Sequence, residues 1–166
     1  MISRNIISNG LMLFISLCSL KLSCSRGEDN YQVNKNILPT PFEITIYDSD
    51  YSMAFSRIYT LREDSIHIVF SGELVGEIDT VIFERELSKD ERIEIMKFFT
   101  IFPLDKLEPK YIIDTVFDGD QKLFMFKIGT IEKRIQVSNY FQEDLASLID
   151  LVNKFVPVDY RIKYNR

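Results

Sequence analysis

The segment from Leu87 to Pro103 most constrains the fold, because it joins a helix-start signal to a helical hydrophobic repeat. Ser88 and Glu91 stand three residues apart, as in a capping box, where each side chain bonds a backbone N–H of the other residue. Pro103 cannot continue a helix and marks its end. Between these signals, apolar residues recur at helical spacing at Ile95, Phe98, Phe99 and Phe102. The sequence therefore predicts an amphipathic helix that buries one face.

The rest of the chain after residue 41 alternates between strand and helix patterns. Period-two alternation predicts strands at 42–47, 55–61, 65–70, 78–84, 123–128 and 131–137, and a short edge strand at 160–164. Residues 104–111 are expected to form a loop. Asn139 and Gln142 are candidate caps for a second helix, which ends before Pro157. Its predicted core stripe is Phe141, Leu145, Leu148, Ile149, Val152 and Phe155.

This pattern predicts a single α+β domain with the order roughly ββββ-α-ββ-α-β. Short turns between successive strands favour a mainly antiparallel sheet. Two amphipathic helices are expected to pack on one face of that sheet.

The N-terminal segment has a different pattern and is typical of a targeting signal. Residues 6–20 are apolar and uncharged, which suits a signal-peptide core but is short for a membrane span. The stretch Leu20–Cys24 resembles the signal of bacterial lipoproteins, in which the cysteine becomes the first mature residue and carries lipid. It departs from that pattern at Lys21. The alternatives are an ordinary secretory signal cleaved near Ser23, lipidation at Cys18, and an uncleaved anchor.

The predicted organisation therefore has three parts. Residues 1–23 form a lipoprotein-type signal peptide, residues 24–40 a lipidated Cys24 with a flexible polar tether, and residues 41–166 the α+β domain. The start of the tether, Ser25–Asn30, also resembles the export signal of surface-exposed lipoproteins in the phylum Bacteroidota. A polar spacer without that role fits these residues as well.

Charge and cysteine content exclude several kinds of chemistry. Loss of residues 1–23 leaves 18 basic against 25 acidic residues, a net charge of −7. This balance argues against nucleic-acid binding, which needs a clustered basic surface. No cysteine follows Cys24, so the expected domain has no disulfide, thiolate metal site or cysteine nucleophile.

No catalytic constellation is visible in the sequence. His67 is the only histidine and lies on an expected strand, where a strand-face role is the ordinary interpretation. The acid pairs Asp48/Asp50 and Asp118/Asp120 offer oxygen ligands for a cation, but neither has EF-hand spacing. Turn formation is the ordinary role of such residues. We therefore predict no catalytic residue, no cofactor and no metal ligand.

Three further triplets resemble an O-glycosylation acceptor motif of Bacteroidota envelope proteins. They are Asp64-Ser65-Ile66, Asp79-Thr80-Val81 and Asp114-Thr115-Val116. Strand-entry residues explain each triplet equally well.

The domain also resembles small uncharacterised lipoproteins of the Bacteroidota. The residues that carry this resemblance are Leu87–Glu91, Phe117–Gly119, Lys133–Tyr140 and Leu148–Asn153. The resemblance implies an envelope location and an α+β domain. We expect the lipid to anchor the protein to the outer membrane, with the domain periplasmic or surface-exposed. It brings no known activity.

The expected function is non-enzymatic: a lipid-anchored envelope protein that binds or supports another envelope component through its sheet face or loops. One alternative is an acidic inhibitor or immunity-type protein that masks a basic partner. A remote alternative is a carboxylate-based hydrolase, which needs two convergent acids in a pocket.

Overall fold

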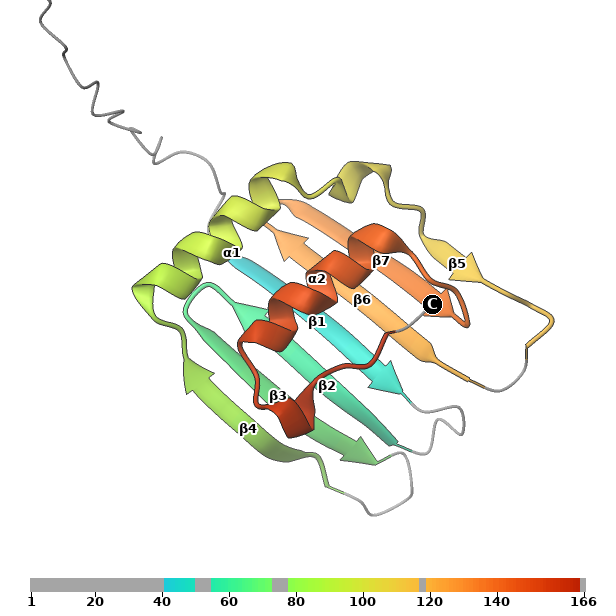
Figure 1. Cartoon of the computed structure of the whole chain (residues 1–166), viewed down its shortest axis with the longest axis horizontal. Helices are drawn as coiled ribbons and strands as arrows, with labels where there is room; N and C mark the ends of the chain where they lie inside the picture. The colour runs from blue at the N-terminus through green and yellow to red at the C-terminus, as the bar shows by residue number, and fades with distance from the viewer. Residues whose placement is uncertain (1–40, 50–54, 73–77, 117–118, 165–166) are drawn as a thin grey trace, which may run out of the picture. The chain divides into compact units, whose positions relative to one another are not determined.

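The computed structural model describes residues 41–49, 55–72, 78–116 and 119–164, which form one sheet with helices on one face (Figure 1). The sheet has seven strands in the order β4-β3-β2-β1-β6-β7-β5. The strands are β1 (Phe42–Ser49), β2 (Phe55–Arg62), β3 (Ser65–Gly72), β4 (Thr80–Glu86), β5 (Lys110–Ile112), β6 (Gln121–Ile128) and β7 (Ile131–Ser138). The helices are α1 (Lys89–Ile101) and α2 (Glu143–Lys154), with short 3-10 turns η1 (Leu104–Lys106) and η2 (Val158–Tyr160). The predicted fold class, a single mainly antiparallel α+β sheet with two helices on one face, is confirmed.

The seventh strand differs in place from the predicted one. Residues 160–164 pair with no strand in the described part of the chain. Asn153 of α2 instead bonds both backbone groups of Ile162, at 2.9 Å to its carbonyl and 2.8 Å from its N–H. These bonds satisfy the backbone without a sheet neighbour. The seventh strand is β5, which pairs parallel with β7 inside the segment expected to be a loop.

The core lies between the helices and one face of the sheet. On β1 and β6 every second side chain is buried, with Ile44 and Ile46 of β1 opposite Phe126 and Phe124 of β6. This is the period-two pattern that predicted these strands. Leu145, Leu148, Ile149 and Val152 of α2 are also buried, as their helical spacing predicted.

The predicted capping box starts α1. Ser88 accepts from the Glu91 N–H at 3.3 Å, and the Glu91 carboxylate accepts from the Ser88 N–H at 2.8 Å. Arg85 of β4 donates two further hydrogen bonds to that carboxylate, at 2.8 and 3.0 Å. The Arg85 guanidinium, together with Ser88, lowers the pKa of Glu91 to about 2. The capping box at the start of α1 is thus also bonded to the edge strand β4 through Arg85.

We expect Glu91→Gln to destabilise the protein in a pH-dependent manner. Because the folded-state pKa lies below the ordinary 4.5, the ionised carboxylate stabilises the fold above about pH 4.5. That contribution disappears as the pH falls towards about 2. Urea unfolding of wild type and variant should therefore give stabilities that converge across this window. The difference should also shrink in an Arg85→Ala background, and a constant difference at all pH values would contradict this role.

Candidate functional site

Several predicted positions lie outside the described residues. These are the signal peptide, the tether with Cys24, and the acids Asp50 and Asp118. Lipidation at Cys24 therefore stays a prediction. No helix among the described residues is both long enough and apolar enough to cross a bilayer.

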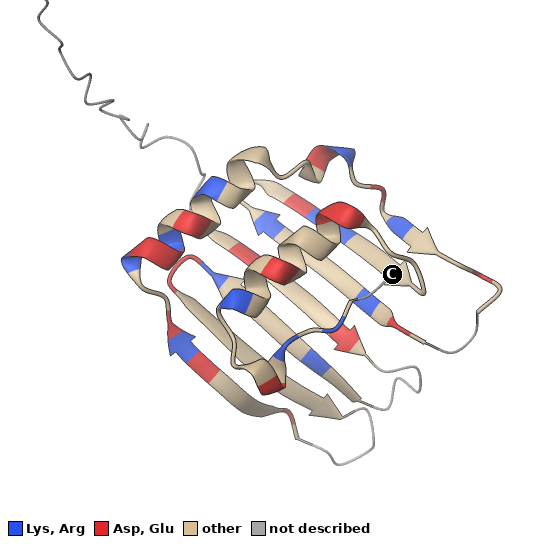
Figure 2. Cartoon of the chain, in the orientation of Figure 1, with Lys and Arg blue, Asp and Glu red and all other residues tan. Residues whose placement is uncertain are grey.

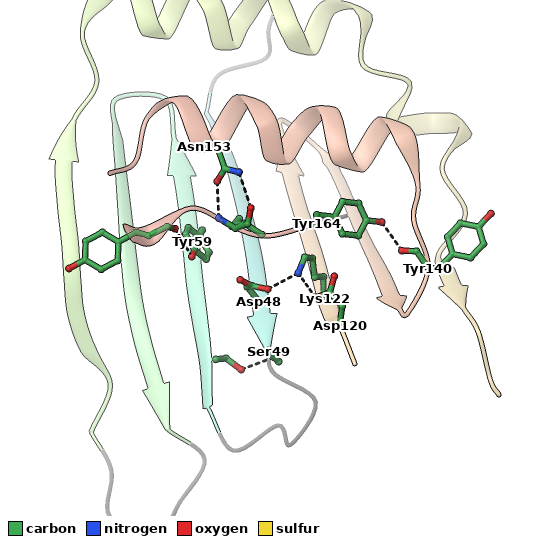
Figure 3. Close-up of polar contacts among 11 residues, drawn as sticks. Asp48, Ser49, Tyr59, Asp120, Lys122, Tyr140, Asn153 and Tyr164 are labelled. Atoms are coloured by element: carbon green, nitrogen blue, oxygen red, sulfur yellow. Dashed lines mark hydrogen bonds and ion pairs between the residues drawn. The ribbon is translucent and has the colours of Figure 1, made fainter. Parts of the chain in front are cut away.

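The remaining member of each acid pair belongs to one ion cluster. Asp48 is the second-to-last residue of β1 and Asp120 precedes β6, and both accept from the ammonium of Lys122 (Figure 3). The Asp48–Lys122 distance is 2.7 Å. The two acidic turns are distant in sequence, but antiparallel pairing of β1 with β6 places Asp48 directly opposite Lys122. Sequence reasoning singled out both acids but missed the lysine between them.

Burial dominates the electrostatics of this cluster. The Lys122 side chain is 1% exposed and its ammonium lies 5.6 Å from the centre of the Tyr164 ring. Burial raises the pKa of Asp48, and the charge of Lys122 offsets this only in part. No group of three or more metal-ligating side chains occurs among the described residues. The lysine ammonium itself supplies the positive charge that a bound cation would bring to these two carboxylates.

The C-terminal strap, residues 158–164, crosses the helix-side face next to this cluster (Figures 1 and 3). The Tyr59 hydroxyl donates to the Tyr160 carbonyl at 2.8 Å, and the Tyr164 hydroxyl donates to the Tyr140 carbonyl at 2.9 Å. Burial raises the pKa of Tyr59 to about 12, so this hydroxyl keeps its proton at neutral pH. Together with the bonds from Asn153, these contacts fix the course of the strap.

A charged recess lies where the strap meets the ends of β1 and β2. Its volume is about 300 Å³. The side chains of Arg161 and Lys163 are exposed, whereas Ile162 between them is buried. The charged recess is lined by Asp48, Phe55, Arg57, Asp120, Arg161 and Lys163.

The opposite face of the sheet carries an uncharged surface in its middle. The strand register aligns two rows of side chains there, each crossing β6, β1, β2 and β3. The first row is Met125, Thr45, Thr60 and His67, and the second is Leu123, Tyr47, Ile58 and Val69. We call these eight residues the open-face patch; seven of them are half-buried, and Thr60 is 6% exposed. No helix or strand of the described chain covers them, since both helices pack on the other face (Figure 1).

The charges of this face lie beside the open-face patch rather than within it. At one end, Glu43 pairs with Arg62 at 3.0 Å and with Lys127 at 3.6 Å. His67 shares the open face, on the opposite side of β3 from Ile66 and Ile68, as its alternation predicted. Burial, reinforced by the charge of Arg62, lowers the pKa of His67. The imidazole is therefore neutral at neutral pH, and the patch carries no charge.

The three glycosylation-like triplets differ in exposure. Ser65 opens β3 and is followed by the fully buried Ile66. Thr80 is exposed at the start of the edge strand β4. Thr115 lies in a turn after β5, between the exposed residues Asp114 and Val116. All three residues are exposed in the triplets of Thr80 and Thr115, whereas the triplet of Ser65 ends in a buried residue.

The sequence matches no protein-family model and no curated protein. We therefore infer the function from the geometry of the charged recess and the open-face patch.

Proposed function

We propose that this chain is a non-enzymatic binding protein of the cell envelope. Lipid on Cys24 anchors it to the membrane, and its open-face patch binds another envelope protein. The main observation that supports docking at this surface is the pair of uncharged rows of side chains across four strands. Antiparallel sheets with a solvated face ordinarily place polar residues there. Here Tyr47, Ile58, Val69, Leu123 and Met125 occupy that face instead, and apolar patches of this kind mark interaction sites.

The anchor is supported by the N-terminal sequence. The apolar run of residues 6–20 lies just before Cys24, a polar tether follows the cysteine, and the predicted domain begins near residue 41. A tether of this composition gives the domain freedom to orient its patch towards a partner. The resemblance to small Bacteroidota lipoproteins points to the same location.

The two alternative functions have less support. An inhibitor that masks a basic partner needs its acidic residues gathered on one face. Figure 2 instead shows Asp and Glu spread over both helices and several strands, with Lys and Arg among them. Among the described residues, the acidic positions are therefore not gathered on one element, which gives this alternative less support.

A carboxylate-based hydrolase is favoured by one observation, the convergence of Asp48 and Asp120 beside a recess. Burial also raises the pKa of Asp48, as a general acid requires. Both carboxylates, however, bond the same ammonium of Lys122, which lies where a scissile bond or attacking water must fit. The cluster is therefore better suited to holding β1 and β6 together than to hydrolysis.

The docking proposal predicts that charge placed in the open-face patch abolishes partner capture. We expect the double variant Ile58→Lys/Val69→Lys to recover at least about tenfold less partner than wild type, because lysine must be desolvated on binding. The measurement is crosslinked affinity capture of the tagged full-length protein from its native envelope, with quantitative mass spectrometry.

The matched control is Ile101→Lys/Val158→Lys, which adds the same two charges to apolar residues that are 82% and 70% exposed and lie outside the patch. It should capture the partner as wild type does. Circular dichroism of each variant checks that the fold is retained. Equal recovery by the folded patch variant would refute docking at this face.

A further inference from the structure

Among the described residues that line it, the charged recess has more cations than carboxylates, in a protein whose overall charge is negative. Arg57 on β2 and Arg161 and Lys163 on the strap line it together with two carboxylates. Arg161 and Lys163 form no ion pair with any described residue. Side chains alternate in direction along the strap, and Ile162 is held by Asn153. Arg161 and Lys163 therefore both point away from the buried Ile162. The cations are thus held on a positioned backbone.

The two carboxylates that line the recess are shared with a further cation. Asp48 and Asp120 are both bonded to Lys122, whose side chain is 1% exposed. Among the described residues, three cations therefore line the recess beside two carboxylates that already bond a fourth cation. The guanidinium groups of Arg57 and Arg161 offer the planar donor geometry that matches phosphate and carboxylate oxygens.

An apolar wall accompanies the cations. Phe55, at the start of β2, is 43% exposed and lines the recess. Its ring stacks on Phe70 of β3, with centroids 5.7 Å apart, so the exposed aromatic side chain is supported from behind. A volume of about 300 Å³ suits a small molecule.

We infer that the charged recess binds a small organic anion, with its phosphate or carboxylate group on Arg57, Arg161 and Lys163 and its organic part against Phe55. The recess lies on the helix side of the sheet, whereas the open-face patch lies on the other side. Anion binding is therefore independent of the docking proposed above, and either one can fail without the other.

Isothermal titration calorimetry of the full-length protein in non-ionic detergent tests anion binding at this site. The probes are phenyl phosphate and benzoate, which carry one aromatic ring and differ in the anionic group. Benzyl alcohol is the neutral probe. We expect binding of at least one anion, weakened by added salt, and none of the alcohol. The anion that binds more tightly shows whether the recess prefers a phosphate or a carboxylate group.

The decisive variant is Arg161→Ala/Lys163→Ala, in which two exposed side chains are shortened. It should bind the anion at least about tenfold more weakly, since charge-assisted hydrogen bonds are lost. Lys89→Ala/Lys97→Ala removes the same charge from the exposed surface of α1 and should bind as wild type does. Absence of anion binding, equal binding of benzyl alcohol, or equal loss in both double variants would overturn the inference.

Discussion

Replacement of Lys122 by alanine is expected to destabilise the fold by about 3–5 kcal/mol, the usual cost of removing one partner from a buried ion pair. The variant leaves Asp48 partly buried without the ammonium that now lies 2.7 Å away. It also removes the aliphatic stem of Lys122 from the face that holds Phe124 and Phe126. Urea unfolding of the full-length protein gives the change in free energy.

Two further variants test whether the loss of stability comes from the buried ion pair. Lys127→Ala removes the other lysine of β6, which is 53% exposed, and should cost at most about 1 kcal/mol. Lys122→Met/Asp48→Leu replaces the buried pair with apolar side chains and should recover most of the lost stability. If Lys122→Ala costs no more than Lys127→Ala, the ion cluster does not stabilise the junction of β1 and β6.

Replacement of Cys24 by alanine is expected to release the protein from the membrane. Each buried CH₂ of an acyl chain contributes about 0.8 kcal/mol to membrane binding, so loss of the lipidated cysteine removes the whole anchor. Metabolic labelling with a fatty-acid analogue and fractionation of the envelope measure both consequences. Wild type should be labelled and sediment with membranes, whereas Cys24→Ala should be neither labelled nor retained.

The other cysteine provides the matched control. Cys18→Ala removes a thiol from the expected signal peptide and should leave labelling and fractionation unchanged. Label that is lost with Cys18→Ala would move the anchor to that residue. An unlabelled protein that stays with the membrane in both variants would indicate an uncleaved hydrophobic segment instead.

The sequence predicts most of the fold because its strongest signals are local. The capping box of Ser88 and Glu91 needs only residues of one helical turn, and the structure confirms it. The alternation of β1 and β6 likewise predicts which side chains are buried. The strap is different, because Asn153 satisfies the backbone of Ile162 through side-chain bonds that leave no periodic pattern.

The ion cluster shows why the candidate site is harder to predict. Lys122 alternates with Phe124 and Phe126, a signal that it faces the core. Its partner Asp48 is 74 residues away, and only the register of β1 against β6 brings them together. The sequence therefore identifies Asp48 and Asp120 as acidic turn residues but does not show that they share one lysine.

Site-specific photo-crosslinking in living cells can detect contact between the open-face patch and a protein partner in the envelope. A photo-reactive amino acid replaces Ile58 within the patch or Ile101 on the exposed surface of α1. Docking on the patch predicts one discrete crosslinked product from position 58 and none from position 101. The same product from position 101, or no product from position 58 in a folded and membrane-bound protein, would contradict it.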